Sequence, residues 1–283
     1  MSDQFSANPI GSVAEQNEQA SRPHQQIVNE QVALDTETPK ANSLAQKVKV
    51  WDFPLRLFHW SLVLLFIFSF VSVKISEMDW HFKSGILISA LLVFRLLWGL
   101  VGSFHAKFQH FIASPKRTFQ YIFSSLISTK RKHKTGTEYI GHNPAGGWMV
   151  VIMLVSLLVT VFTGLVSTDE IYLVGPLYGF VTESFALSAT SVHRFMETVL
   201  LVLVGLHIAA IVFYRIFKQQ KLTKAMITGY KQIQPESLNE HERKLLEQQL
   251  HDTQSKKSNK LPVMACLIVL AIATGWAAWL WQL

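Results

Sequence analysis

Residues 192–214, VHRFMETVLLVLVGLHIAAIVFY, are an apolar stretch that carries two histidines, His193 and His207. In an α-helix, the 14-residue interval between them corresponds to about 21 Å along the axis. At about 100° per residue, the helix also returns both imidazoles to nearly the same face. An ionisable side chain inside a membrane costs about 2.5 kcal/mol or more and usually serves a function. The stretch therefore predicts two ligand sites at two depths of one membrane-spanning helix.

The composition is typical of a membrane protein rather than of a soluble enzyme. Of the 283 residues, 49% are hydrophobic and only 16% are charged. The net charge is +7, but the basic residues cluster in loops beside apolar runs, which indicates membrane orientation and not a nucleic-acid surface. The lone Cys266 excludes a disulfide framework, a covalent Cys-x-x-Cys-His haem site and a Cys-rich metal site. Any haem in this protein must therefore be bound non-covalently.

Five apolar runs approach the length of about 20 residues that is needed to cross the hydrocarbon core. They predict membrane-spanning helices at 54–74, 80–101, 144–166, 192–214 and 262–282. We therefore expect an all-α integral membrane protein, with a four-helix transmembrane haem-binding bundle and a fifth C-terminal transmembrane helix.

The charges of the loops predict the orientation of the chain. Basic stretches lie before the first span, between the second and third spans, and after the fourth span. Loop 167–191 contains three acidic residues and no Lys or Arg. Because basic loops stay in the cytoplasm, we expect a cytoplasmic N-terminus and a periplasmic C-terminus in a bacterial inner membrane. An amphipathic helix at 114–126 is expected to lie on the membrane surface.

The chain divides into four predicted parts. Residues 1–46 are rich in Gln, Asn, Ser and Glu, and we expect a disordered cytoplasmic segment because they cannot bury enough apolar area to fold. Residues 47–215 form the four-helix domain. Residues 216–260 are a charged cytoplasmic linker, in which Ser237–Glu240 has the spacing of a capping box and predicts a short helix. Residues 261–283 contain the last span.

Four of the 11 histidines lie within predicted spans, and they pair by depth. In the predicted orientation, His59 and His207 lie toward the cytoplasm, whereas His81 and His193 lie toward the periplasm. Two histidines from different helices at each depth meet the requirement for two six-coordinate haems inside a helix bundle. An iron with both axial positions filled passes electrons and does not bind substrate. The other histidines lie in polar segments, where a solvated imidazole is the ordinary case: His24, His105, His110, His133, His142, His241 and His251.

Two arginines are further candidates for cofactor binding. Arg56 lies on the same helix face as His59, and Arg95 lies near the cytoplasmic end of the second span. A guanidinium binds carboxylates through two hydrogen bonds, so each arginine is a candidate partner of haem propionates or of a quinone head group. The alternative for each is to snorkel to the membrane interface. Gly85 and Gly205 would let a porphyrin approach, although small residues also serve helix–helix contacts.

Four short motifs accompany these histidines. They are RLFHW at 56–60, HFKSG at 81–85, RLLWGLVG at 95–102 and GHNP at 141–144. With His193 and His207, the chain over about residues 47–215 resembles the bacterial cytochrome b561 family. The resemblance is strongest to its branch with the di-haem cytochrome b subunits of nickel–iron hydrogenases. Arg194 stands where the resemblance leads us to expect an acidic residue, and Glu197, one turn later, is expected to take that role.

The resemblance implies two haem b groups, one ligated by His59 with His207 and one by His81 with His193. It also implies a membrane carrier that moves electrons between the quinone pool and a protein partner, either a hydrogenase or a periplasmic cytochrome c. Such a chain is an electron-transfer subunit of a redox complex rather than an enzyme on its own.

Two other functions stay open from the sequence. One is a stand-alone haem enzyme with quinone as co-substrate, for example one that oxidises superoxide. The other is a histidine-based ion or metal transporter. The fifth span is either a homodimer contact or an anchor for a partner. The partners expected of the electron carrier are the lipid bilayer, quinone and a periplasmic or membrane redox protein, and not nucleic acid.

Overall fold

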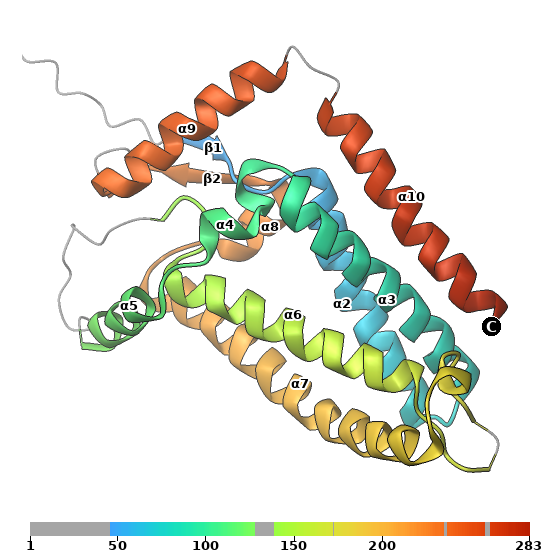
Figure 1. Ribbon diagram of the computed structural model, residues 1–283. Helices are drawn as coiled ribbons and strands as arrows, with labels where there is room; N and C mark the ends of the chain where they lie inside the picture. The colour runs from blue at the N-terminus through green and yellow to red at the C-terminus, as the bar shows by residue number, and fades with distance from the viewer. Residues whose placement is uncertain (1–45, 128–138, 172, 235–236, 258–260) are drawn as a thin grey trace, which may run out of the picture. The chain divides into compact units, whose positions relative to one another are not determined.

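A computed structural model describes residues 46–127, 139–171, 173–234, 237–257 and 261–283. Within these residues, five helices are long and apolar enough to cross a membrane. They are α2 (Phe53–Lys74), α3 (Met78–Val101), α6 (Pro144–Leu165), α7 (Glu183–Phe217) and α10 (Leu261–Gln282). For the described part of the chain, the prediction of an all-α integral membrane protein is confirmed (Figure 1).

Helix α7 is longer than the sequence predicts. It has 35 residues and begins at Glu183, inside the segment that the sequence assigns to a loop ending at residue 191. Thr182 caps it, since its side chain accepts a hydrogen bond from the N–H of Phe185. At about 1.5 Å per residue, α7 is about 52 Å long and exceeds the hydrocarbon core of about 30 Å. Its first turns mix serine and threonine with Phe185 and Leu187, so they form a helix with a lower mean hydropathy than the span that follows.

A polar cap followed by proline begins two of the spans. The Asp52 side chain accepts a hydrogen bond of 2.8 Å from the N–H of Leu55 at the start of α2. Asn143 accepts one of 2.8 Å from the N–H of Gly146 at the start of α6. Proline suits the first turn of a helix because no N–H donor is needed there. Asp52 also accepts a hydrogen bond of 2.9 Å from Nε1 of Trp98, which joins the start of α2 to the end of α3.

Two antiparallel helix pairs form the bundle, α2 with α3 and α6 with α7 (Figure 1). Helix α3 also contacts α6 and α10. One apolar cluster joins α2, α3 and α10 and includes Phe58 and Val269. Another joins α3, α6 and α7 through Leu92, Leu157 and Leu200. Helix α3 is therefore the central helix of the bundle, and it is the most buried of the five spans among the described residues.

The fifth span packs against the bundle of its own chain. Nε1 of Trp276 donates a hydrogen bond of 3.0 Å to Oγ of Ser89 on α3. Val269, Ala273 and Leu280 of α10 are buried. One face of α10 is thus occupied by α3, and only its other face remains for lipid, a second copy or a partner.

The helix ends define two sides of the bundle. We call the side on which α2 and α6 begin the strand side, because strand β1 (Gln46–Lys49) leads into α2 and pairs antiparallel with β2 (Tyr230–Ile233). We call the opposite side, which carries the α2–α3 turn and the connection from α6 to α7, the loop side. Gln46, the last residue of the segment expected to be disordered, belongs to β1. The rest of that segment lies outside the described residues.

Several short elements on the strand side form a folded unit that we call the cap. Besides β1 and β2, it contains 3₁₀-helix η1 (Phe104–Ala106) and helices α4 (Phe108–Phe111), α8 (Leu222–Thr228) and α9 (Glu240–Lys257). Its core consists of Val48, Val50, Ile140, Ile233 and Leu238. The sequence predicts a linker with one short helix at 216–260, and the structure has α8, β2 and α9 there. The β1–β2 pairing joins distant parts of the chain, so no local pattern reveals it.

Helix α9 begins with a different cap from the one that the sequence predicts. Oδ1 of Asn239 accepts a hydrogen bond of 2.8 Å from the N–H of Glu242. Oγ of Ser237 instead donates to the carbonyl of Gln234. The predicted capping box at Ser237 is therefore wrong, because Asn239 lies one position before the helix and takes the capping role.

Helix α5 (Pro115–Ile127) occupies the segment in which an amphipathic helix was expected. Phe119 and Phe123 are 71% and 61% exposed, and they leave an apolar face open. The hydroxyl of Tyr121 lies 2.9 Å from that of Tyr214, which ties α5 to α7. The location of α5 on the membrane surface stays a prediction.

Removal of one buried carboxylate is expected to loosen the cap. Glu242 is only 5% exposed, and its Oε2 accepts a hydrogen bond of 3.0 Å from the N–H of Ile140. The Glu242→Ala variant leaves that N–H buried without a partner, at a cost of about 1–3 kcal/mol. We expect faster proteolysis within the cap. Glu240→Ala, which changes an exposed side chain on the same helix, is the control, and equal proteolysis of the two variants would contradict the prediction.

Candidate functional site

Two histidines from different helices lie next to each other on the loop side. His81 belongs to the first turn of α3, and His193 lies in the first half of α7. Their ring centroids are 5.9 Å apart, and the ring planes are inclined by 80°. Two imidazoles at this separation can bind one ligand between them.

Hydrogen bonds hold one nitrogen of each of these rings. Nδ1 of His193 lies 2.8 Å from the carbonyl oxygen of Thr160 on α6. Because a carbonyl only accepts, we assign the proton to Nδ1 and the free lone pair to Nε2. Nδ1 of His81 lies 3.0 Å from Oγ and 3.2 Å from the carbonyl oxygen of Ser69 on α2. Proteins commonly orient metal-ligating histidines by such a bond to the second nitrogen.

A glycine on α6 makes room for the His193 ring. A Cβ at Gly164 would lie 2.8 Å from Cε1 and 3.0 Å from Nδ1 of His193. Such distances are too short, so any larger residue must displace the ring. The sequence predicts that Gly85 and Gly205 let a porphyrin approach the helices. They differ from Gly164, because a Cβ at either position would meet nothing within 4 Å. Their role stays a prediction.

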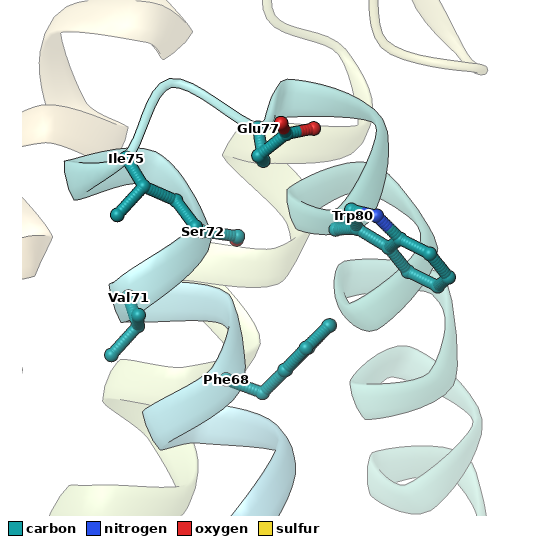
Figure 2. A pocket seen from close by; sticks show the side chains of 6 residues that line it. All are labelled: Phe68, Val71, Ser72, Ile75, Glu77 and Trp80. Carbon is teal, nitrogen blue, oxygen red and sulfur yellow. The ribbon is translucent and has the colours of Figure 1, made fainter.

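Ser69 belongs to a short series of polar contacts at the end of α2. Oγ of Ser72 donates a hydrogen bond of 2.8 Å to the carbonyl of Ser69. Ser72 also lines a pocket at the α2–α3 turn (Figure 2), together with Phe68, Val71, Ile75, Glu77 and Trp80. Phe68 and Trp80 are 45% and 51% exposed. The pocket is therefore part of the apolar outer surface of the α2–α3 pair, and the polar contacts of Ser69 lead from it to His81.

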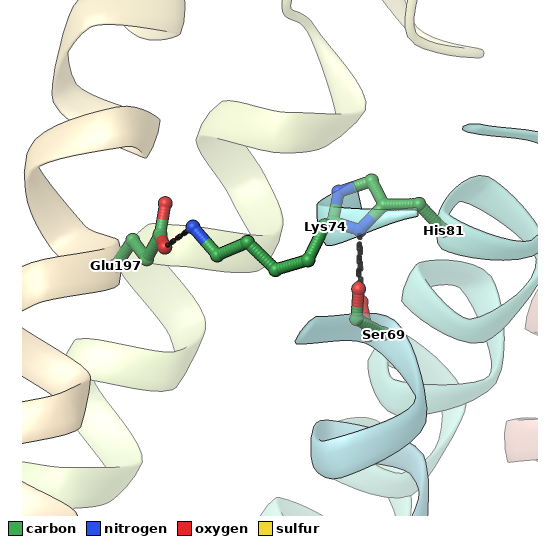
Figure 3. A network of polar contacts seen from close by, with 4 residues as sticks. All are labelled: Ser69, Lys74, His81 and Glu197. Atoms are coloured by element: carbon green, nitrogen blue, oxygen red, sulfur yellow. Dashed lines mark hydrogen bonds and ion pairs between the residues drawn. The ribbon is translucent and has the colours of Figure 1, made fainter. Parts of the chain in front are cut away.

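An ion pair connects α2 to α7 beside the two imidazoles. Nζ of Lys74 lies 2.8 Å from Oε1 of Glu197, and Figure 3 shows this contact next to the Ser69–His81 hydrogen bond. Glu197 therefore pairs with Lys74. The sequence assigns Glu197 to the support of the histidine, but the carbonyl of Thr160 holds Nδ1 of His193. The pairing of α6 with α7 thus supplies a backbone acceptor for His193, and a supporting role of Glu197 stays a prediction.

The strand side brings together the other two histidines of the spans. His59 of α2 and His207 of α7 lie close enough for their imidazoles to interact electrostatically. Nδ1 of His59 is buried and has no hydrogen-bond partner among the described residues. An unsatisfied buried nitrogen is costly, so a ligand on the His59 ring is chemically favourable. The ring also contacts Trp60, with centroids 5.1 Å apart.

His142 lies close to this pair, contrary to the prediction that it is solvated. Its ring packs against Trp51 and Phe111, with centroid distances of 4.5 and 4.8 Å. Burial lowers the pKa of His142 to about 3, and the nearby Arg95, together with His105 and His207, acts in the same direction. The imidazole is therefore neutral over the physiological range. Its Nδ1 is buried without a hydrogen-bond partner in the described part of the chain.

The prediction of a solvated side chain is also wrong for His105. This residue is 8% exposed, and its Nε2 lies 2.9 Å from Oε1 of Gln249 on α9. Burial lowers its pKa, and the bond to Gln249 opposes that shift. The cap covers His105, which a local pattern cannot show. His241 and His251 are exposed as predicted, whereas His24 and His133 lie outside the described residues.

A polar pocket on the strand side contains these buried imidazoles in its wall. His105 and His142 line it together with Arg117, Tyr139 and the buried Glu242. The carboxylate of Glu242 is held by the N–H of Ile140. The pocket therefore offers imidazole, guanidinium and phenol groups to a small polar molecule close to His207.

The two predicted arginines contact the backbone of the cap region. Nη1 of Arg56 donates to the carbonyl of Ile227. Arg95 is 3% exposed, and its Nη1 donates a hydrogen bond of 3.2 Å to the carbonyl of Ala106. Its guanidinium also lies 4.6 Å from the ring centroid of Phe108. These contacts join membrane helices to the strand-side loops. A role of either arginine toward a cofactor stays a prediction.

Sequence reasoning missed four residues of this region. Thr160 and Ser69 each hold the Nδ1 atom of a histidine. Thr160 does so through its backbone carbonyl, and every residue type has such a carbonyl, so the sequence cannot reveal this contact. Gly164 and His142 had a signal that could have been used. A glycine within a span indicates close contact, and His142 belongs to the GHNP motif.

Two comparisons place these features among known proteins. The model of the family described as prokaryotic cytochrome b561 matches residues 50–229, which is more than half of the chain. A protein of Rhizobium leguminosarum bv. viciae, named as a probable Ni/Fe-hydrogenase B-type cytochrome subunit, is 24% identical over 241 residues. That match covers 71% of this chain and 95% of the relative.

Proposed function

The chain belongs to the prokaryotic cytochrome b561 family and is a membrane cytochrome b of electron transfer, and we propose that it holds two haem b groups and carries electrons across the bacterial inner membrane. His81 and His193 would hold one haem, and His59 and His207 would hold the other. Electrons pass between the quinone pool and a protein redox partner. The proposal rests on one observation above all, the 5.9 Å separation of the His81 and His193 rings.

The loop-side pair fits a bis-histidine haem. A metal–imidazole bond is about 2 Å long, so two imidazoles on opposite sides of one metal have ring centroids about 6 Å apart. The observed 5.9 Å agrees with this value. Both Nδ1 atoms are held by Ser69 and Thr160, which leaves Nε2 of each ring for the iron. Bonds of this kind also raise the basicity of the ligand.

Different observations support a second haem at the strand-side pair. His59 and His207 lie on separate helices within electrostatic reach, and Nδ1 of His59 is buried without a hydrogen-bond partner among the described residues. The His193–His207 interval of 14 residues along α7 separates the two sites by about 21 Å. The two sites therefore lie at different depths of the membrane.

Haem b would supply one-electron chemistry at its iron when the four imidazoles hold it. The chain contributes the orientation of the four imidazoles, the apolar surroundings and the separation of the sites. This division of roles supports an electron carrier and not an enzyme that transforms a substrate at the metal.

The partner is expected on the loop side. The Lys- and Arg-rich segments lie at the strand side, so the strand side is cytoplasmic and the loop side periplasmic. The Rhizobium relative is named as a hydrogenase cytochrome subunit, which supports a hydrogenase as the partner, with a periplasmic cytochrome c as the alternative.

Quinone is expected at the strand-side pocket. His142 is neutral and lies near His207. Its Nδ1 atom is buried and has no hydrogen-bond partner among the described residues. A neutral imidazole nitrogen donates in one tautomer and accepts in the other. It therefore suits both the carbonyl of a quinone and the hydroxyl of a quinol.

The His142→Phe variant tests this assignment. Phenylalanine keeps an aromatic ring between Trp51 and Phe111 and removes the nitrogen, so we expect about a tenfold loss in kcat/KM for quinone, which corresponds to one hydrogen bond. Haem spectra should stay unchanged. His251→Phe, at an exposed position of the cap outside this pocket, is the control. Equal quinone kinetics in the two variants would rule out His142 as a quinone contact.

Directional electron entry tests the proposed function itself. In liposomes with the loop side outward, a membrane-impermeant reductant should reduce both haems and then the quinone. Failure to reduce any haem from the loop side would contradict the proposal. Quinone reduction by superoxide without a partner protein would instead establish the stand-alone enzyme.

A further inference from the structure

We propose that Lys74 and Glu197 shift the redox potential of the haem that His81 and His193 would hold in opposite directions, and that their ion pair keeps the two shifts in balance. The inference rests on the proposed function, since it requires a haem at this pair. It assigns Lys74 and Glu197 as positioning residues that act on the iron through their charges, and not as ligands.

The pair lies directly beside the two imidazoles. Glu197 follows His193 by one helical turn, a spacing that places two side chains on adjacent positions of a helix face, and it interacts electrostatically with the His193 ring. Its Oε1 is 2.8 Å from Nζ of Lys74. Lys74 belongs to the last turn of α2, and Ser69 of the same helix contacts His81. Figure 3 shows the lysine chain extending from α2 toward α7 next to the His81 ring.

The lysine is held in this place by two contacts. Besides the carboxylate, its Nζ lies 4.9 Å from the ring centroid of Phe70 on α2. Both charged side chains are partly exposed, 55% for Lys74 and 41% for Glu197, so solvent weakens their fields. Their closeness to the imidazoles and the apolar membrane around the site preserve part of the effect.

The two charges act on the iron in opposite directions. Reduction adds one electron to the iron, so a nearby cation stabilises the reduced form and a nearby anion stabilises the oxidised form. With both present, the two effects largely cancel. Removal of one partner leaves the other uncompensated, and the sign of the resulting shift depends on which partner is removed.

Redox titration of the full-length membrane protein tests the inference. At a fixed ambient potential, Lys74→Gln should lower the ratio of reduced to oxidised loop-side haem by about threefold to tenfold. For a one-electron couple this equals a shift of about 30 to 60 mV to lower potential. Glu197→Gln should shift the potential by a similar amount in the opposite direction. The double variant should return close to the wild-type value.

A control within the same molecule separates electrostatics from damage to the fold. The strand-side haem lies about 21 Å away along α7, and its potential should not change. The exchanged variant Lys74→Glu with Glu197→Lys restores a pair of net charge zero and should rescue haem content if a single variant loses it. High ionic strength should reduce the shifts, because the side chains are partly exposed.

The outcomes separate failure of the proposed function from failure of the role of the ion pair. If wild-type protein lacks a haem at the loop-side pair, the proposed function fails. If both haems are present but the single variants shift the potential in the same direction, or not at all, the proposed function stands and the role of the ion pair is refuted.

Discussion

The His207→Ala variant is expected to lose the strand-side haem and to keep the loop-side haem. His207 is the α7 member of the pair with His59, and alanine supplies no ligand. His193 lies 14 residues earlier on the same helix and keeps its bond to the Thr160 carbonyl. We therefore expect the haem content to fall by one half, from two to one per chain, with a single remaining redox transition.

The mirror variant is the control for this result. His193→Ala should remove the loop-side haem and leave the strand-side haem. In liposomes with the loop side outward, electrons from an impermeant reductant should enter His207→Ala but not reach quinone. Loss of the loop-side haem from His207→Ala, with retention of the other, would refute the pairing.

The Gly164→Ala variant is expected to have nearly as large an effect, although glycine ligates nothing. The added Cβ would lie 2.8 Å from Cε1 of His193, so the imidazole must leave its position. Its hydrogen bond to the Thr160 carbonyl, 2.8 Å long in the structure, would be lost or lengthened. We expect at least half of the protein to lack the loop-side haem, and the remainder to show an altered low-spin spectrum.

Gly275→Ala provides the matched control for that substitution. Gly275 also lies within a membrane-spanning helix, α10, but a Cβ there would meet nothing within 4 Å. This variant should keep both haems. Equal haem content and equal spectra of Gly164→Ala and Gly275→Ala would show that Gly164 does not make room for the His193 ring.

Local sequence patterns predicted the spans well because hydropathy over about 20 residues directly reflects the membrane environment. The ends of α2, α3, α6 and α10 agree within a few residues with the predictions. The start of α7 does not, because helix propensity and hydropathy are separate properties. In the segment from Ser184 to Thr190, serine and threonine lower the mean hydropathy but do not prevent a helix.

Long-range contacts explain what the sequence could not show. The pairing of Gln46 with Ile233 joins two segments that are far apart in the sequence. The sequence predicts the first to be a disordered N-terminal segment and the second to be a linker. That pairing builds the cap, and His105 is buried by its contact with α9. The Lys74–Glu197 bridge likewise depends on how α2 and α7 meet. The four histidines of the spans were evident from the sequence, while their supporting atoms required the structure.

The most direct test of the central claim is the number and type of haems in the purified protein. We expect the pyridine haemochrome assay to give two haem b groups per chain, and electron paramagnetic resonance to show that both are low-spin with two histidine ligands. One haem per chain, no haem, or a high-spin iron with an open axial position would contradict the claim.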